Sequence, residues 1–472
     1  MEKEISMNKM GVVPIKKLML LMGIPMIMSM VLQAFYNIVD SYFVSCIKDT
    51  VEISNMGNYA VNALTLAYPI QMLMVAIGVG TGVGVNALLS KSLGQENREK
   101  ASRIAGNAVF LGVCIYVVFL LFGLFVVNGY LNSQTSDAIV LEMGSSYLGI
   151  CTRLSFGVIL FMIYEKLLQS TGRTTLSTIA QMAGVLTNII FDPILIFGYF
   201  GFPQMGINGA AYATVTGQVV SLIVGAIFNY RLNKDIDSKL IYLKPQGAVI
   251  SEIYQVGLPA ILMQALMSFM TYGVNIIFGT ISSAVVIAYG VYYKIQQFIF
   301  FAAFGLNNAL IPIVAFNYGK KDRVRVNDGI KYGIIYILII MGLGALGFQM
   351  FASQIAGIFA LSAETQRLCI RAIRIVTLGY LFAGANIAFQ GIFQAFGSGV
   401  CSLIISFLRL IAIVLPLAYL LTKLQNAQDI IWIAFPAAEA CALILAIIFM
   451  KQISKAKISE YYSLSEYSPA TD

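Results

Sequence analysis

The sequence predicts an all-α integral membrane protein with twelve transmembrane helices in two pseudo-symmetric six-helix lobes. Hydrophobic residues make up 59% of the 472 residues and charged residues only 11%, which is too little charge to cover a water-soluble chain of this length. The apolar runs are long, and this favours helices over the short alternating strands of a barrel. A sparse set of residues also recurs at a fixed distance, which indicates that one unit is present twice.

Matched residues define the duplicated unit. The segment Gly23-Ile24-Pro25 corresponds to Gly257-Leu258-Pro259, at an offset of 234 in the numbering. Further matches share an offset of 225: Ile70-Gln71 with Ile295-Gln296, Gly80 with Gly305, Gly94 with Gly319, Arg98 with Arg323, Gln169 with Gln394, and Gly172 with Gly397. The decrease from 234 to 225 predicts a deletion of nine residues in the second copy, in a loop between residues 258 and 295.

Twelve apolar runs between turn signals predict the transmembrane spans. They cover residues 15–44, 59–89, 101–127, 141–169, 175–199 and 207–232 in the first copy, and 250–279, 285–316, 327–352, 367–396, 399–421 and 428–450 in the second. The predicted domains are a first lobe (1–232), a cytoplasmic linker (233–248) and a second lobe with a short cytoplasmic tail (249–472). Because each copy has an even number of spans, we expect a pseudo-two-fold axis along the membrane normal.

Basic residues indicate the orientation. They gather in the loops of one face, whereas the opposite loops carry little beyond Lys48 and Lys423. By the positive-inside rule both termini are cytoplasmic, although Arg367, Arg371 and Arg374 on the outer side depart from the rule. We expect a multi-pass protein of a bacterial or archaeal cytoplasmic membrane that works as a monomer in the lipid bilayer, without a nucleic-acid partner.

Several classes of chemistry lack their residues. The chain has no histidine, its six cysteines form no C-x-x-C motif, and it carries no phosphate-binding G-x-x-x-x-G-K-[ST] motif. A histidine proton relay, a histidine-based triad and an ATPase motor on this chain are therefore excluded. We expect a protein that is not an enzyme and has no cofactor, with H⁺ or Na⁺ as the coupling ion.

Two intramembrane acids are the main candidates for ion coupling. Asp40 and Asp192 lie far along the first and fifth spans, at similar depth in the outer half of the membrane. Tyr36 and Asn37 precede Asp40 by about one turn, and Asn188 precedes Asp192 in the same way. Such a group can share a proton or coordinate Na⁺. The alternative is that each acid caps a helix break or bonds to nearby backbone.

The repeat supports the functional alternative. At the repeat offsets, Asp40 corresponds to Val274 and Asp192 to Leu417, so the second lobe lacks both acids. A feature that the scaffold needed would be expected in both copies. We therefore predict ion coupling within the first lobe alone.

Other intramembrane residues give weaker predictions. Lys294 lines a second-lobe cavity or bonds to a neighbouring carbonyl, and Arg409 forms a buried ion pair with Glu439. The aliphatic stem of Lys166, near the cytoplasmic end of its span, is expected to extend its charge to the interface. Pro25 interrupts the first helix and is the predicted hinge, because proline removes a backbone hydrogen bond. The 21 Met, 25 Tyr and 30 Phe residues suit a cavity for lipophilic cations.

The sequence resembles the MATE (multidrug and toxic compound extrusion) family over all twelve spans. The motifs that carry the resemblance are Gly-Ile-Pro at 23–25, Tyr-Asn-Ile-Val-Asp at 36–40, the segment 90–95 after the glycine-rich second span, Asn188 with Asp192-Pro193, and Gly209–Thr214. The resemblance implies cation-coupled drug export by alternating access. In the DinF-like branch the ion site would comprise Asp40, Asn188, Asp192 and Thr214, and Na⁺ would bind there if it is the coupling ion.

The NorM-like branch relies instead on acids in the seventh and tenth spans. The nearest residues here are Gln264 and Asn386, which are neutral, and this departure casts doubt on a second-lobe Na⁺ site. We assign Gln264, Lys294 and Asn386, together with Tyr36 and Asn37, to the substrate cavity.

Three other functions fit the sequence less well. A lipid-linked oligosaccharide flippase of the same wider superfamily would need several cavity cations, and only Lys294 and Arg409 qualify. A channel would be expected to show a ring of identical short subunits rather than a fused pseudo-dimer. An intramembrane enzyme would need a nucleophile–base pair or a metal cluster, and neither is evident.

Overall fold

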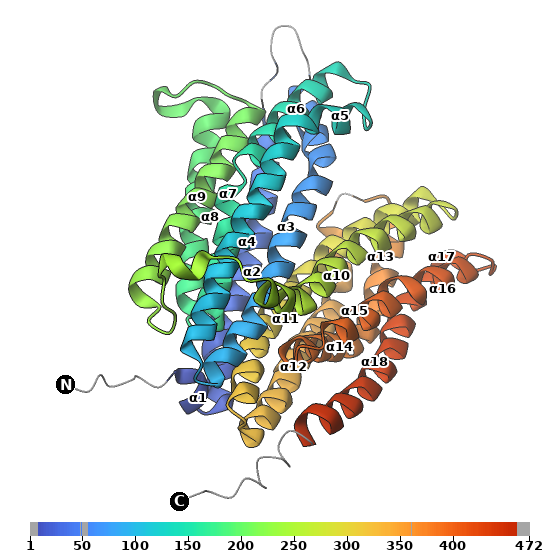
Figure 1. The fold of residues 1–472 in the computed structure, drawn as a ribbon. Helices are drawn as coiled ribbons and strands as arrows, with labels where there is room; N and C mark the ends of the chain where they lie inside the picture. The colour runs from blue at the N-terminus through green and yellow to red at the C-terminus, as the bar shows by residue number, and fades with distance from the viewer. Residues whose placement is uncertain (1–7, 48, 50–54, 360, 460–472) are drawn as a thin grey trace, which may run out of the picture. The chain divides into compact units, whose positions relative to one another are not determined.

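The computed structural model describes residues 8–47, 49, 55–359 and 361–459 (Figure 1), and these ranges are helical without a strand. Eleven helices are long and apolar enough to cross a membrane, and a bent pair completes the twelve predicted spans. The pair consists of α6 (Ala138–Arg153) and α7 (Phe156–Ser170), which meet at a 43° bend. The sequence predicted a single run, 141–169, at this place. Lys48 and the tail beyond residue 459 lie outside the described residues.

The elements follow the predicted order. Those before the linker are α1 (Lys9–Val12), α2 (Ile15–Ser45), α3 (Met56–Gly94), α4 (Arg98–Phe125), α5 (Val127–Asn132), α6, α7, α8 (Thr174–Phe197), η1 (Tyr199–Gly201) and α9 (Ile207–Leu232). Those after it are η2 (Leu240–Leu243), α10 (Gly247–Gly279), α11 (Ser283–Gly319), α12 (Arg323–Gly357), α13 (Ala363–Val376), η3 (Thr377–Gly379), α14 (Tyr380–Ala395), α15 (Gly399–Phe407), η4 (Leu408–Ala412), α16 (Val414–Leu421), α17 (Ala427–Ile430), η5 (Ile431–Ile433), α18 (Ala434–Ile453) and η6 (Ser454–Ser459).

Helix ends confirm the repeat. The last residues of α2 and α10 differ by the first repeat offset, whereas those of α3 and α11, and of α7 and α14, differ by the second. The connection between the first two spans shrinks from residues 46–55 in the first copy to residues 280–282 in the second. The deletion therefore lies in the predicted loop.

Backbone conformation repeats even where the side chains differ. Glu96 and Lys321 occupy equivalent positions and both have left-handed φ angles, of 57° and 62°. The amides of Asn97 and Asp322, one residue later, donate to the carbonyls of Ser92 and Asn317, each at 3.0 Å. A left-handed residue that is not glycine is uncommon, so two at the same repeat offset show that the same turn is built twice.

The two copies of this turn also make a reciprocal contact. A Cβ atom placed on Gly94 would lie 1.9 Å from the carbonyl oxygen of Phe316, and one on Gly319 would lie 2.1 Å from that of Lys91. Lys91 and Phe316 are themselves repeat-related. Glycine at both positions allows a backbone-to-backbone approach that any side chain would prevent.

By its contacts the chain divides into two compact units. One contains residues 1–27, 90–97 and 254–472, and the other contains residues 28–89 and 98–253. Three helices, α2, α3 and α10, therefore pass from one unit to the other. In α2 the change falls just after Ile27, two residues beyond Pro25. The domain boundaries expected from the sequence stay a prediction.

In the first of these units, an arginine clamp fixes the segment before α2. Arg325, at the start of α12, donates from its guanidinium to the carbonyls of Met10 and Val13, both at 2.8 Å. Its Nε bonds to Asn317 Oδ1 at 2.8 Å, and Asn317 Nδ2 in turn reaches Met10 O at 3.1 Å. These charge-assisted bonds to backbone carbonyls hold the N-terminal segment in place.

In the other unit, the linker lies along α4. The amide of Asp237 donates to Ser102 Oγ at 2.8 Å, and the amide of Gln246 donates to Asn107 Oδ1 at 2.8 Å. One expectation fails in the same unit: Lys166 does not extend outward but is buried, with its Nζ bonded to Gln169 Oε1 at 2.8 Å. The small residue Gly82 leaves the room that the lysine stem fills, because a Cβ there would lie 2.6 Å from Lys166 Cγ.

Candidate ion and substrate site

The four predicted ion-coupling residues come together where α2, α8 and α9 meet. Helices α8 and α9 run side by side (Figure 1). Their backbones approach closely because Gly184 has no side chain: a Cβ atom there would lie only 2.4 Å from the carbonyl oxygen of Gly217. This close packing places Asn188 against Thr214, with Nδ2 at 3.4 Å from Oγ1.

Hydrogen bonds join Asp192 and Tyr36 to this pair, and Asp40 lies near them on α2. Asn188 Nδ2 also donates to Asp192 Oδ1 at 3.3 Å, and the hydroxyl of Tyr36 donates to Thr214 Oγ1 at 3.3 Å. Asp40 lies one turn beyond Tyr36 on α2, and its charge interacts with that of Asp192. We call Asp40, Asn188, Asp192 and Thr214 the first-half site.

The first-half site is buried and rich in acceptors. Asp192 is fully buried, and Asp40 is 8% exposed. Three of its buried oxygen atoms, Asp40 Oδ1, Asn188 Oδ1 and Asp192 Oδ2, lack a hydrogen-bond partner within the described residues. Buried polar atoms are almost always paired, and carboxylates especially so. Two acids with surplus oxygen acceptors fit a proton or a hard cation such as Na⁺.

The alternative role of the two acids, capping a helix break, does not match the local structure. Helix α2 continues past Asp40 to Ser45, and α8 continues through Pro193 to Phe197. Within the described residues, Asp192 Oδ1 is bonded by the Asn188 side chain and Oδ2 has no partner. Neither acid lies at a helix end that needs a cap.

Sequence reasoning missed two neighbours of Asp40 and a third residue that bonds to one of them. The side chains of Tyr147 and Cys151, both buried on α6, interact electrostatically with Asp40. Gln71 on α3 donates from Nε2 to the Tyr147 hydroxyl at 3.3 Å. Gln71 is one of the repeat-matched residues, so its polarity inside a span was a signal that could have found it.

The residues assigned to the substrate cavity are placed differently from one another. Tyr36 is half-buried at the first-half site, and the side chain of Asn37 lies outside the described residues. In the second half of the chain, Gln264 on α10 and Lys294 on α11 are exposed, and Asn386 on α14 is fully buried. Lys294 bonds to no carbonyl in the described part of the chain. A charged side chain in mid-span is costly in lipid, so we expect the Lys294 side chain to face water.

The predicted ion pair of the second half is confirmed. Arg409 Nη1 donates to Glu439 Oε1 at 2.8 Å, and the two side chains are only 5% and 16% exposed. Asn386 Nδ2 donates to Glu439 Oε2 at 2.8 Å and to the Glu439 carbonyl at 2.9 Å. Asn386 therefore positions a carboxylate that lies on another helix, α18.

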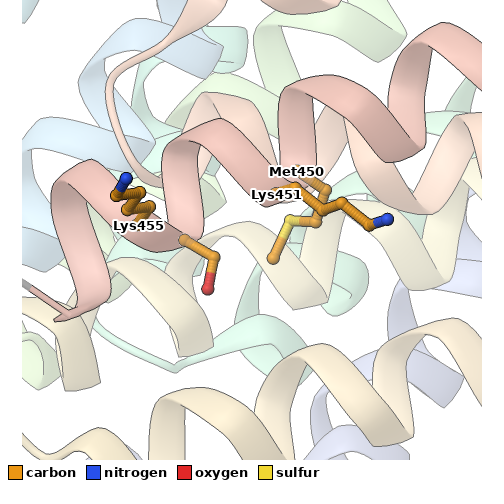
Figure 2. Close-up of a pocket in the computed structure, with 4 residues that line it drawn as sticks. Met450, Lys451 and Lys455 are labelled. Carbon is orange, nitrogen blue, oxygen red and sulfur yellow. The ribbon is translucent and has the colours of Figure 1, made fainter.

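One surface hollow lies away from these clusters. An open hollow of about 450 Å³ is lined by Met450, Lys451, Ser454 and Lys455 near the end of α18 (Figure 2). Its two lysines come from successive turns, and it contains none of the predicted site residues. The described residues contain no group of three or more Cys, Asp or Glu side chains arranged to hold a metal ion.

The MatE family model matches the chain twice, over residues 25–194 and 259–420. The chain belongs to the MatE family. The two matched stretches begin at Pro25 and at its repeat mate Pro259, so the family unit coincides with the duplicated unit. This bears out the resemblance to MATE proteins that the sequence motifs indicated.

Two proteins similar to this MatE protein are both named as multidrug export proteins. It is 26% identical over 421 residues to the multidrug export protein MepA of Staphylococcus saprophyticus, covering 89% of this chain and 90% of that protein. It is also 26% identical over 436 residues to MepA of Staphylococcus aureus, covering 91% and 92% of the two chains. Both alignments therefore span nearly the whole length of each protein.

A solved MATE structure has the same fold. The outward-facing conformation of a multidrug resistance MATE family transporter of the MOP superfamily matches with a TM-score of 0.89 at 22% identity. The match covers 97% of this chain and all of the other.

Proposed function

We propose that this MatE protein exports lipophilic, mostly cationic compounds across a cytoplasmic membrane by alternating access, in exchange for H⁺ or Na⁺ bound at the first-half site. The surplus acceptors of the paired acids Asp40 and Asp192 carry the proposal. The names of the MepA relatives support small-molecule export. The basic residues of the linker face support cytoplasmic termini.

A cation bound at the first-half site would change how tightly the surrounding helices can pack. Without a cation, two buried and interacting carboxylates are costly unless water reaches them. With a proton or Na⁺ bound, the site is nearer to neutral and the helices can pack around it without water. A ligand shifts a conformational equilibrium only through such differential affinity. Cation binding and substrate release are then coupled through α2.

Dye transport into everted membrane vesicles tests the proposal. A pH gradient or a Na⁺ gradient, applied separately, is expected to drive uptake of a lipophilic cationic dye. An anionic dye of similar size should be taken up far less, because acids and aromatic side chains favour cations. Equal uptake of both dyes would contradict the cation preference, and uptake unaffected by either gradient would contradict cation coupling.

A lipid-linked oligosaccharide flippase is not favoured. Of its two candidate cavity cations, Arg409 is already paired with Glu439. A single exposed cation, Lys294, is a poor match for a pyrophosphate head group, which carries several negative charges.

Pro25 is the proposed hinge of α2. The part of α2 before it is anchored, because a Cβ on Gly23 would lie 2.3 Å from Leu306 Cδ1 on α11. The change of compact unit follows at Ile27. The missing backbone hydrogen bond at Pro25 allows a bend where anchored and coupled portions meet.

Pro25→Ala should therefore slow cation-driven dye transport severalfold, and Pro259→Ala should slow it less, because no acid of the first-half site lies on α10. Both rates are to be normalised to folded protein measured by gel filtration. Equal slowing by the two substitutions would leave Pro25 with a packing role only.

A further inference from the structure

The second half of the chain carries its own buried charge at the place that corresponds to the first-half site. At the repeat offset of 225, Thr214 on α9 corresponds to Glu439 on α18. The offset holds along this helix, because α9 ends at Leu232 and the last span ends at Lys457. A hydroxyl in one copy is thus replaced by a carboxylate in the other.

Arg409, the ion-pair partner of Glu439, also has a repeat-related position. It corresponds to Gly184, which lies one helical turn before Asn188. Arg409 lies in η4, a π-helical turn in the middle of the eleventh span, and such wide turns often mark functional positions. A glycine that allowed close packing in the first half is replaced by a guanidinium in the second.

The two places differ in charge. The first-half site has two acids and, within the described residues, no basic partner. The second-half cluster, which we define as Arg409, Glu439 and Asn386, has one acid and one guanidinium. The guanidinium lies on Glu439 Oε1 and the amide on Oε2, at 2.8 Å each. Arg409 Nε and Asn386 Oδ1 remain buried without partners in the described residues.

We propose that Arg409 is a tethered cation that permanently occupies the second-half counterpart of the cation site, so that only the first half exchanges H⁺ or Na⁺ with solution. This inference deepens the proposed function and rests on it. In the first half, an ion from solution neutralises the buried carboxylates. In the second half, the guanidinium of the chain itself neutralises the buried carboxylate. Pairing in cis removes the dependence on ion concentration, because the guanidinium does not leave.

Removal of the guanidinium should then create a new cation site. Glu439 Oε1 would lose its donor, while Oε2 would stay bonded to Asn386. A buried carboxylate without a counter-charge is strongly unfavourable and binds a proton or Na⁺ instead. Tyr292 on α11, whose hydroxyl lies 3.3 Å from that of Tyr380, is a second titratable group near Glu439 in the described part of the chain.

The test uses the purified full-length protein with Asp40→Asn and Asp192→Asn, so that the first-half site does not contribute. Unfolding temperature is measured in Na⁺ and in choline, at acidic and at alkaline pH. When Arg409→Gln is added, Na⁺ or acidic pH should raise the unfolding temperature by about 2 °C or more beyond the rise seen in the starting variant. Arg409→Gln with Glu439→Gln should lose this response, and Arg409→Lys, which keeps a cation, should never acquire it.

A response absent from Arg409→Gln, or retained when Glu439→Gln is added, would overturn the inference. Arg409→Gln could yield no folded protein in choline. In that case Na⁺, acidic pH or the added Glu439→Gln substitution should restore folding, and failure of all three would also overturn the inference. The proposed function fails separately, if the wild-type first half shows no cation response that Asp40→Asn and Asp192→Asn remove.

Discussion

We expect Asp40→Asn and Asp192→Asn each to reduce gradient-driven export to the level of vesicles without the protein. Each substitution removes one of the two carboxylates that would hold the coupling cation, and keeps the size and polarity of the side chain. Folding should not suffer, because the substitution removes a buried charge that has no basic partner in the described residues. Dye efflux and unfolding temperature of the same preparations check both statements.

Repeat-related positions provide the matched controls. Leu417→Met, at the counterpart of Asp192, conserves volume and should leave coupling unchanged. Val274→Ala, at the counterpart of Asp40, removes packing from a fully buried position and should lower stability without altering the ratio of driven to undriven transport. Full drug resistance in cells that carry either asparagine variant would contradict coupling within the first half.

Gly94→Val and Gly319→Val should abolish accumulation of folded protein. A Cβ at either position would lie within 2.1 Å of a backbone carbonyl oxygen, at 1.9 Å for Gly94 and 2.1 Å for Gly319. Backbone yields less readily than a flexible side chain, so we expect a loss of at least about 3 kcal/mol of stability. Fluorescence-detected gel filtration of tagged variants measures the folded fraction.

Gly290→Val is the control on α11, the helix that ends at Gly319. A Cβ on Gly290 has no neighbour within 4 Å, so this variant should accumulate almost normally. Normal yields of Gly94→Val and Gly319→Val would show that the turn regions separate more easily than their contact indicates.

The repeat and the first-half site were both accessible from the sequence, for related reasons. Glycine and proline are retained where the backbone needs them, so Gly94, Gly319, Pro25 and Pro259 kept the register of the repeat visible. An acid in an apolar span is costly enough to be conspicuous in the sequence, and this identified Asp40, Asp192 and Glu439 as candidates.

Features that depend on tertiary packing were not accessible. Hydropathy does not encode the bend between Arg153 and Phe156, because α6 and α7 taken together form one run that is apolar enough to cross a membrane. The burial of Lys166 depends on room left by Gly82 on a different helix. Tyr147 joins Asp40 only through the packing of α6, since tyrosine is common in spans and carries no positional signal.

The arginine clamp has a consequence for biosynthesis. The carbonyls of Met10 and Val13 precede the first span in the chain, whereas Arg325 is made only after the whole first copy of the repeat and two spans of the second. Until then the N-terminal segment has no access to this partner, and eight spans are synthesised first. The segment before the first span is thus fixed late, because this clamp can close only in a chain whose translation has passed into the ninth span.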